Sequence, residues 1–74
     1  MPTEDAAPVT LSVNGAVRRV ARGLALDALV AETTAAPSGV AVAVNEDVVP
    51  RSQWPSTRLG EGDRVEILTA VQGG

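Results

Sequence analysis

The chain has 74 residues, 45% of them hydrophobic and 20% charged, with a net charge of −3, which excludes two domains and an intrinsically disordered chain. It contains no Cys, His, Lys or Tyr, so it lacks the usual nucleophiles, general bases and nitrogen or sulfur metal ligands, and we do not expect an enzyme. The acidic balance argues against a nucleic-acid partner, because neutralising phosphates needs clustered cations.

Residues 1–8 precede any apolar pattern and are expected to form a flexible leader. They contain two prolines and two acidic residues and lack the basic segment of a secretory signal. No later stretch approaches the roughly eighteen apolar residues of a membrane-spanning helix. The sequence therefore predicts a soluble, cytoplasmic protein without membrane contact, with one domain over residues 9–70.

Two strands joined by a tight turn are predicted first. Apolar and polar residues alternate over residues 9–13, and Asn14-Gly15 follows, a strong hairpin signal because both residues tolerate positive φ. The second strand, residues 16–22, fits less well, since a strict two-residue turn would place Val17 on the face opposite the other apolar residues. We therefore expect a bulge or a longer loop. The arginines of this strand are interpreted as a solvated face, with a binding patch as the alternative: Arg18, Arg19 and Arg22.

One short helix is predicted next. Leu26, Leu29 and Val30 stand at positions i, i+3 and i+4, which places them on one helix face. Residues 37–39, Pro-Ser-Gly, end the helix. Its start has no Ser, Thr, Asp or Asn to cap it, so packing must stabilise it.

A third strand is predicted over residues 40–44. Val alternates there with small side chains, the pattern of a strand in the middle of a sheet that is covered on both faces. Residues 45–47 can turn the chain into a short edge strand, Val48-Val49. Pro50 ends that strand because it lacks a backbone donor.

The last third of the domain is predicted to end in a central strand. Residues 51–59 are irregular with one helical turn, and the Gly-rich residues 60–63 turn the chain into a strand over residues 64–69. In this strand Val65 and Ile67 point inward. The element order predicts an α+β fold of the β-grasp type, with a mixed four- to five-stranded sheet packed on one helix and the first and last strands paired at its centre.

The tail over residues 71–74 shows no structural pattern and ends in Gly73-Gly74. Without Cβ atoms the glycines can enter a narrow channel, and the six residues from Thr69 onward reach roughly 20 Å. A terminal carboxylate needs activation, which adenylation by ATP with Mg²⁺ supplies, and a sulfur donor can then convert it into a thiocarboxylate. We therefore predict a carrier whose Gly74 is modified and whose Gly73, Gln72 and Val71 enter a partner's channel. A chance diglycine is the alternative.

The stretch from Val42 to Trp54, with its Pro50-Arg51 pair, followed by residues 59–65 and the closing diglycine, resembles the ThiS family of thiamine-biosynthesis sulfur carriers over about residues 9–74. The resemblance implies a ubiquitin-like β-grasp fold and no bound cofactor. It further implies adenylation of the terminal Gly by a ThiF-like adenylyltransferase that uses ATP and Mg²⁺. Sulfur would come from a cysteine desulfurase or sulfurtransferase relay and pass to thiazole synthase, ThiG. Ala25 stands where the family often has a capping Thr.

Partner contacts are predicted around the end of the last strand, because the tail can enter a site only if that strand is held there. Leu68 and Ala70 are the candidates at this end. Trp54 and Arg51 are further candidates for partner contacts. Packing over one end of the helix is the alternative for Trp54, and Arg51 is interpreted as structural rather than catalytic. The scattered carboxylates do not predict a metal site or an acid–base pair: Asp27, Glu32, Asp47 and Asp63.

Three other functions remain compatible with this sequence. A molybdopterin synthase small subunit shares the fold and the tail but forms a stable complex with its large subunit. A ubiquitin-like modifier would form isopeptide conjugates with lysines. A pure binding module would ignore ATP and the adenylating enzyme.

Overall fold

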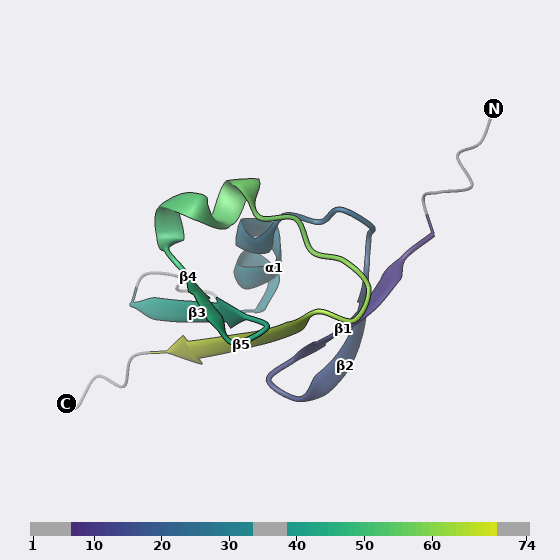
Figure 1. The fold of residues 1–74 in the computed structure, drawn as a ribbon, viewed down its shortest axis with the longest axis horizontal. Helices are drawn as coiled ribbons and strands as arrows, with labels where there is room; N and C mark the ends of the chain where they lie inside the picture. The colour runs from purple at the N-terminus through teal and green to yellow at the C-terminus, as the bar shows by residue number, and fades with distance from the viewer. Residues whose placement is uncertain (1–6, 34–38, 70–74) are drawn as a thin grey trace.

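The computed structural model describes residues 7–33 and 39–69, and these fold into one sheet with helices on one side (Figure 1). In chain order the elements are β1 (Val9–Val13), β2 (Ala16–Val20), α1 (Leu26–Thr33), β3 (Val40–Val44), β4 (Asp47–Val49), the 3₁₀-helix η2 (Arg51–Ser56) and β5 (Arg64–Thr69). The five strands are arranged in the order β2-β1-β5-β3-β4. β1 and β5 are parallel and the other pairs are antiparallel, so the predicted β-grasp arrangement is confirmed. No helix in the described part of the chain is long and apolar enough to cross a membrane.

The β1–β2 hairpin has a strict two-residue turn, so the expected bulge or longer loop is wrong. Val13 pairs with Ala16, and Asn14 and Gly15 have φ of 52° and 85°, as a type I′ turn requires. The register therefore places Val17 on the face away from the helix, where it is 74% exposed. That face of the sheet is open to solvent, so an exposed Val there disturbs no core packing.

β3 is an inner strand, but the expectation of a middle strand covered on both faces is wrong. β5 holds the middle of the sheet, and β3 lies between β5 and β4. Val42 is buried on the helix side, whereas Ala41 on the other side is exposed. α1 and η2 lie on one side of the sheet (Figure 1), which leaves the alanine face uncovered. The short edge strand β4 ends before Pro50 as predicted.

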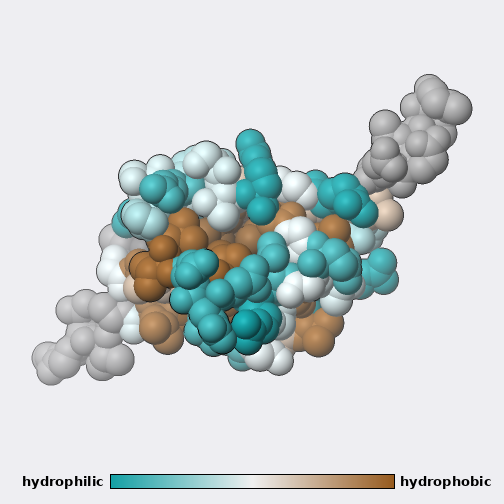
Figure 2. Space-filling view, viewed as in Figure 1, coloured by the Kyte–Doolittle hydropathy of each residue, from teal (hydrophilic) through white to brown (hydrophobic). Residues whose placement is uncertain are grey.

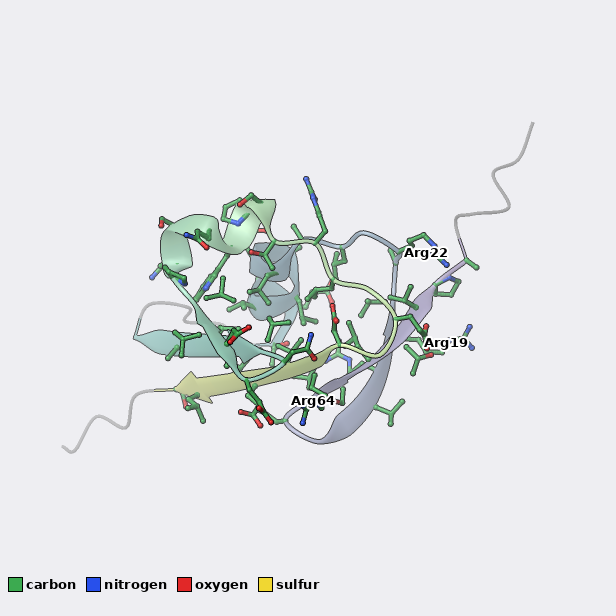
Figure 3. The ribbon with its side chains drawn as sticks, viewed as in Figure 1. Arg19, Arg22 and Arg64 are labelled. Carbon is green, nitrogen blue, oxygen red and sulfur yellow. The ribbon has the colours of Figure 1, made fainter. Side chains whose placement is uncertain are left out.

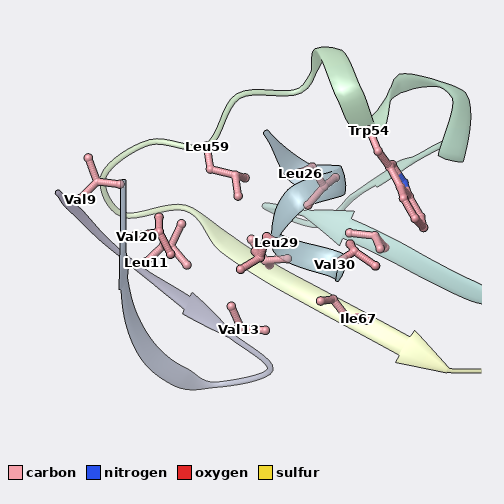
Figure 4. Close-up of a cluster of buried hydrophobic side chains, with 12 residues drawn as sticks. Val9, Leu11, Val13, Val20, Leu26, Leu29, Val30, Trp54, Leu59 and Ile67 are labelled. Atoms are coloured by element: carbon pink, nitrogen blue, oxygen red, sulfur yellow. The ribbon is translucent and has the colours of Figure 1, made fainter. Parts of the chain in front are cut away.

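The core lies between the sheet and the helices and is almost entirely aliphatic (Figure 4). Leu26, Leu29 and Val30 are fully buried, which confirms the predicted helix face. The uncapped start of α1 is held by the segment after η2: the N–H of Leu26 donates to the carbonyl of Thr57 at 2.8 Å. Packing and this bond together replace a side-chain cap. The other members of the core are Val9, Leu11, Val13, Val20, Val42, Trp54, Leu59, Val65 and Ile67.

Candidate functional site

The last strand leads directly to the predicted tail. β5 lies between β1 and β3 in the middle of the sheet and ends at Thr69. Five predicted site residues follow and lie outside the described residues: Ala70, Val71, Gln72, Gly73 and Gly74. The surface around the end of β5 is therefore the part of the site whose geometry is defined, and a partner that takes up the tail must approach it there.

An apolar surface lies on one side of this end, on the open face of the sheet. Leu68 is 67% exposed and pairs with Ala41, and Ala43 pairs with Val48, which is 75% exposed. Residues directly opposite on neighbouring strands point to the same face, so these four side chains form one surface, which we call the open-face patch. Because their side chains are small, the two alanines leave a shallow depression between Leu68 and Val48. Glu66, also opposite Ala43, borders the patch.

Exposed apolar groups are a general feature of this small domain. In the view of Figure 2, hydrophobic surface lies between hydrophilic side chains. Scattered apolar side chains at a protein surface need no special explanation. The open-face patch differs because its members are contiguous in the strand register and extend from near the end of β5 across β3 to β4, so a docked partner would cover them together.

The arginines do not form a single basic surface. Arg18 lies on the helix side of β2, where its guanidinium is 3.7 Å from the carboxylate of Glu32, whereas its neighbour Arg19 is exposed on the other side. Arg19 and Arg22 extend from the β2 end of the molecule (Figure 3), and Arg64 pairs with Glu46 at 3.3 Å. Arg18, Arg19 and Arg22 therefore share neither the single solvated face that the sequence predicts nor one binding patch.

Trp54 lies in the core, as its packing interpretation predicts. It is 4% exposed, and its Nε1 donates to the carbonyl of Val49 at 2.9 Å. The guanidinium of Arg51 stacks over the ring, 5.6 Å from its centroid, and is itself exposed. Both residues belong to η2, on the helix side of the sheet, so the structure does not bring them together with Leu68. Arg51 is the part of this pair that a partner can reach.

Two carboxylates hold the turn before β5 through hydrogen bonds. Asp63 accepts hydrogen bonds from the N–H of Gly60 at 2.8 Å and from Nδ2 of Asn45 at 3.0 Å, which fixes the turn before β5. Glu61 accepts the N–H of Thr10 at 2.9 Å. Among residues 7–33 and 39–69 no three carboxylates gather closely enough to hold a metal ion.

Three members of the open-face patch were missed by the sequence reasoning. Ala41 and Ala43 looked like small residues beneath a covering layer, and Val48 like part of an edge strand. The available signal was Val48-Val49 itself: neighbouring residues of a strand point to opposite faces. With one face buried, one of the two valines had to be exposed.

Comparison with known proteins gives consistent matches. The model of the ThiS family matches residues 11–74. The chain is 28% identical over 61 residues to the sulfur carrier protein ThiS of Escherichia coli, covering 82% of this chain and 92% of that protein. A crystal structure of the thiamine biosynthesis protein ThiS from Geobacter metallireducens superposes with a TM-score of 0.77 at 33% identity, covering 89% of this chain and all of that one.

A thiazole synthase also contains a similar segment. The chain is 31% identical over 64 residues to the thiazole synthase of Paramagnetospirillum magneticum, which covers 86% of this chain. The match spans 20% of that protein's length. The similarity therefore concerns a carrier-sized segment within a much larger protein.

Proposed function

The chain belongs to the ThiS family, and on this basis we propose that it is a sulfur carrier of thiamine biosynthesis. The observation that carries the proposal is that the middle strand β5, whose end lies beside an exposed apolar patch, is followed in the sequence by a diglycine. The similarity to the E. coli sulfur carrier over 92% of that protein supports the same role. A carrier of this kind needs a folded domain that a partner can bind and a narrow C-terminal segment that can react.

The proposed chemistry takes place at the carboxylate of Gly74 in a ThiF-like adenylyltransferase. A carboxylate oxygen attacks the α-phosphorus of ATP, pyrophosphate leaves, and Mg²⁺ in the partner neutralises the phosphates. We expect a cysteine desulfurase or sulfurtransferase relay to supply the sulfur as a persulfide. Its terminal sulfur attacks the acyl carbon, AMP leaves, and the carrier is joined to the donor by an acyl disulfide. A second thiol then attacks the donor's sulfur of this S–S bond, so that a new disulfide forms and the thiocarboxylate of the carrier is released. The chain itself contributes no Cys, His or Lys to these steps.

The open-face patch is proposed as the surface that holds the carrier on the adenylyltransferase. The patch begins at Leu68, near the end of β5, and extends across β3 to β4, so covering it fixes the strand from which the reacting segment leaves. Burial of apolar area drives such association without requiring charged partners. Arg51, on the other side of the sheet, stays a separate candidate for a second contact.

We propose a thiazole synthase as the acceptor of the sulfur. The thiazole synthase of P. magneticum, with its segment similar to this chain, supports the pairing, because joining two proteins in one chain raises their effective concentration for each other. The thiocarboxylate sulfur is a soft nucleophile suited to attack on an electrophilic carbon of a small substrate.

The test is ATP–pyrophosphate exchange with a ThiF-like adenylyltransferase. The unmodified chain should support exchange, and deletion of Gly74 should abolish it. Circular dichroism and thermal unfolding of the two proteins should coincide, because the deleted residue lies beyond the last strand. Exchange that persists without Gly74 would contradict the proposed reacting group.

A further inference from the structure

Asn14 joins the first hairpin turn to the far end of β5. Its Oδ1 accepts a hydrogen bond from the N–H of Ile67 at 2.8 Å, and its Nδ2 donates to the carbonyl of Ile67 at 3.2 Å. Its own N–H donates to the carbonyl of Val65 at 2.8 Å. One residue of the turn thus binds β5 at two successive positions of its β1 side.

These bonds continue the β1–β5 ladder beyond the point where its backbone pairing stops. Parallel pairing ends at Val13 and Val65, because the chain then turns away into β2. The Asn14 carboxamide carries one acceptor and donors in a plane, like a peptide group, and supplies the bonds that β1 can no longer make. On the other flank, β3 pairs with β5 as far as Thr69. Without the Asn14 side chain, the backbone N–H and carbonyl of Ile67 would lose these partners, and only β3 would pair with the backbone of β5 beyond Val65.

We propose that Asn14 is a positioning residue for the carrier reaction, because it fixes the direction in which β5 ends. This inference rests on the proposed function. Ile67 is the last residue of β5 that the hairpin holds, and Gly74 follows seven residues later in the sequence. A shift of β5 at Ile67 moves the point from which the reacting segment starts, and a misplacement of about 1 Å is enough to slow a reaction markedly.

The β3–β4 turn supplies a matched control at the other end of the same strand. Asn45 has φ of 51°, close to the 52° of Asn14. Its Oδ1 accepts the N–H of Arg64 at 3.0 Å, and its Nδ2 donates to Asp63 at 3.0 Å. Both asparagines thus make two side-chain hydrogen bonds from a positive-φ turn position, but Asn45 binds the start of β5 and Asn14 binds its second half, at Ile67.

The experiment compares Asn14→Gly with Asn45→Gly, since glycine keeps the positive φ of both turns while removing the carboxamide. Hydrogen exchange of the Ile67 amide should become at least about tenfold faster in Asn14→Gly and stay unchanged in Asn45→Gly. At a temperature where all variants are folded, kcat for adenylation should fall roughly 5- to 20-fold for Asn14→Gly and less than about twofold for Asn45→Gly. KM should change little, because the open-face patch is retained.

A second variant keeps the test decisive if Asn14→Gly does not fold. Asn14→Asp keeps the acceptor for the Ile67 N–H but places an oxygen against the Ile67 carbonyl, and its kcat should also fall. Equal kcat values for the Asn14 and Asn45 variants would overturn the positioning role alone. Absence of adenylation of the unmodified chain would instead overturn the proposed function, and this inference with it.

Discussion

Substitution of Leu68 tests the proposed docking surface, because the resulting loss of binding free energy can be worked out from the exposure of its side chain. Replacing it by Ala removes three carbon atoms, each worth about 0.8 kcal/mol when fully buried. Because the residue is 67% exposed, about two thirds of that burial is still available to a partner. Leu68→Ala should therefore weaken binding to the adenylyltransferase by roughly 1.5 kcal/mol, about tenfold in Kd.

The matched control for this prediction is Val17→Ala. Val17 is 74% exposed and lies on the same open face, but on β2, which β1 separates from β5. Calorimetric titration of the adenylyltransferase should give the unmodified Kd within about twofold for Val17→Ala, and thermal unfolding should change by less than about 0.5 kcal/mol for both variants. An unchanged Kd for Leu68→Ala, or equal losses for the two variants, would refute the open-face patch as the docking surface.

Three further substitutions test the fold. Trp54→Phe removes the hydrogen bond to the Val49 carbonyl and some core volume, so urea unfolding should show a loss of about 2 kcal/mol with folded-state adenylation unchanged; a loss below about 0.5 kcal/mol would contradict the buried bond. Gly15→Ala should cost about 1 kcal/mol, because the φ of 85° is unfavourable although no atom lies within 4 Å of the added Cβ, and an unchanged stability would show that the turn relaxes. Arg18→Ala should cost less than about 0.5 kcal/mol, because its pair with Glu32 is exposed; a loss above about 1 kcal/mol would contradict that assignment.

Elements with local signals could be predicted from the sequence. The helix face of Leu26, Leu29 and Val30 followed from its spacing, and the limits of β5 from the Gly-rich turn before it. The stop at Pro50 followed from a missing backbone donor. In each case the decisive physics lies within a few neighbouring residues, so the sequence displays it directly.

Features set by tertiary contacts could not be predicted in the same way. The hydrophobic pattern of β2 favoured a bulge, but the type I′ geometry of Asn14-Gly15 fixed the register and left Val17 exposed. Alternating Val and Ala fits a strand covered on one face as well as on two, so Ala41 was misplaced. The bonds between Asn14 and Ile67 join residues 53 positions apart, so no local sequence pattern predicts them.

The candidate site also has one part that local sequence signals predict and one part that depends on tertiary contacts. The reacting end and its chemistry were suggested by Gly73-Gly74 and the family resemblance, without reference to the folded body. The surface that presents this end depends on which residues of β3, β4 and β5 share a face, and that required the strand register. The sequence therefore predicted Leu68, near the end of β5, but not Ala41 and Ala43 on the neighbouring strand β3.

The intact mass of the chain is the most direct measure of its proposed role. After incubation with a ThiF-like adenylyltransferase, ATP, Mg²⁺, a cysteine desulfurase and cysteine, one oxygen should be replaced by sulfur, and fragmentation should place the change at Gly74. The sulfur should be lost again when a thiazole synthase and its substrates are added. An unchanged mass, or thiazole formation by a chain whose terminal carboxyl is blocked as an amide, would contradict the sulfur-carrier assignment.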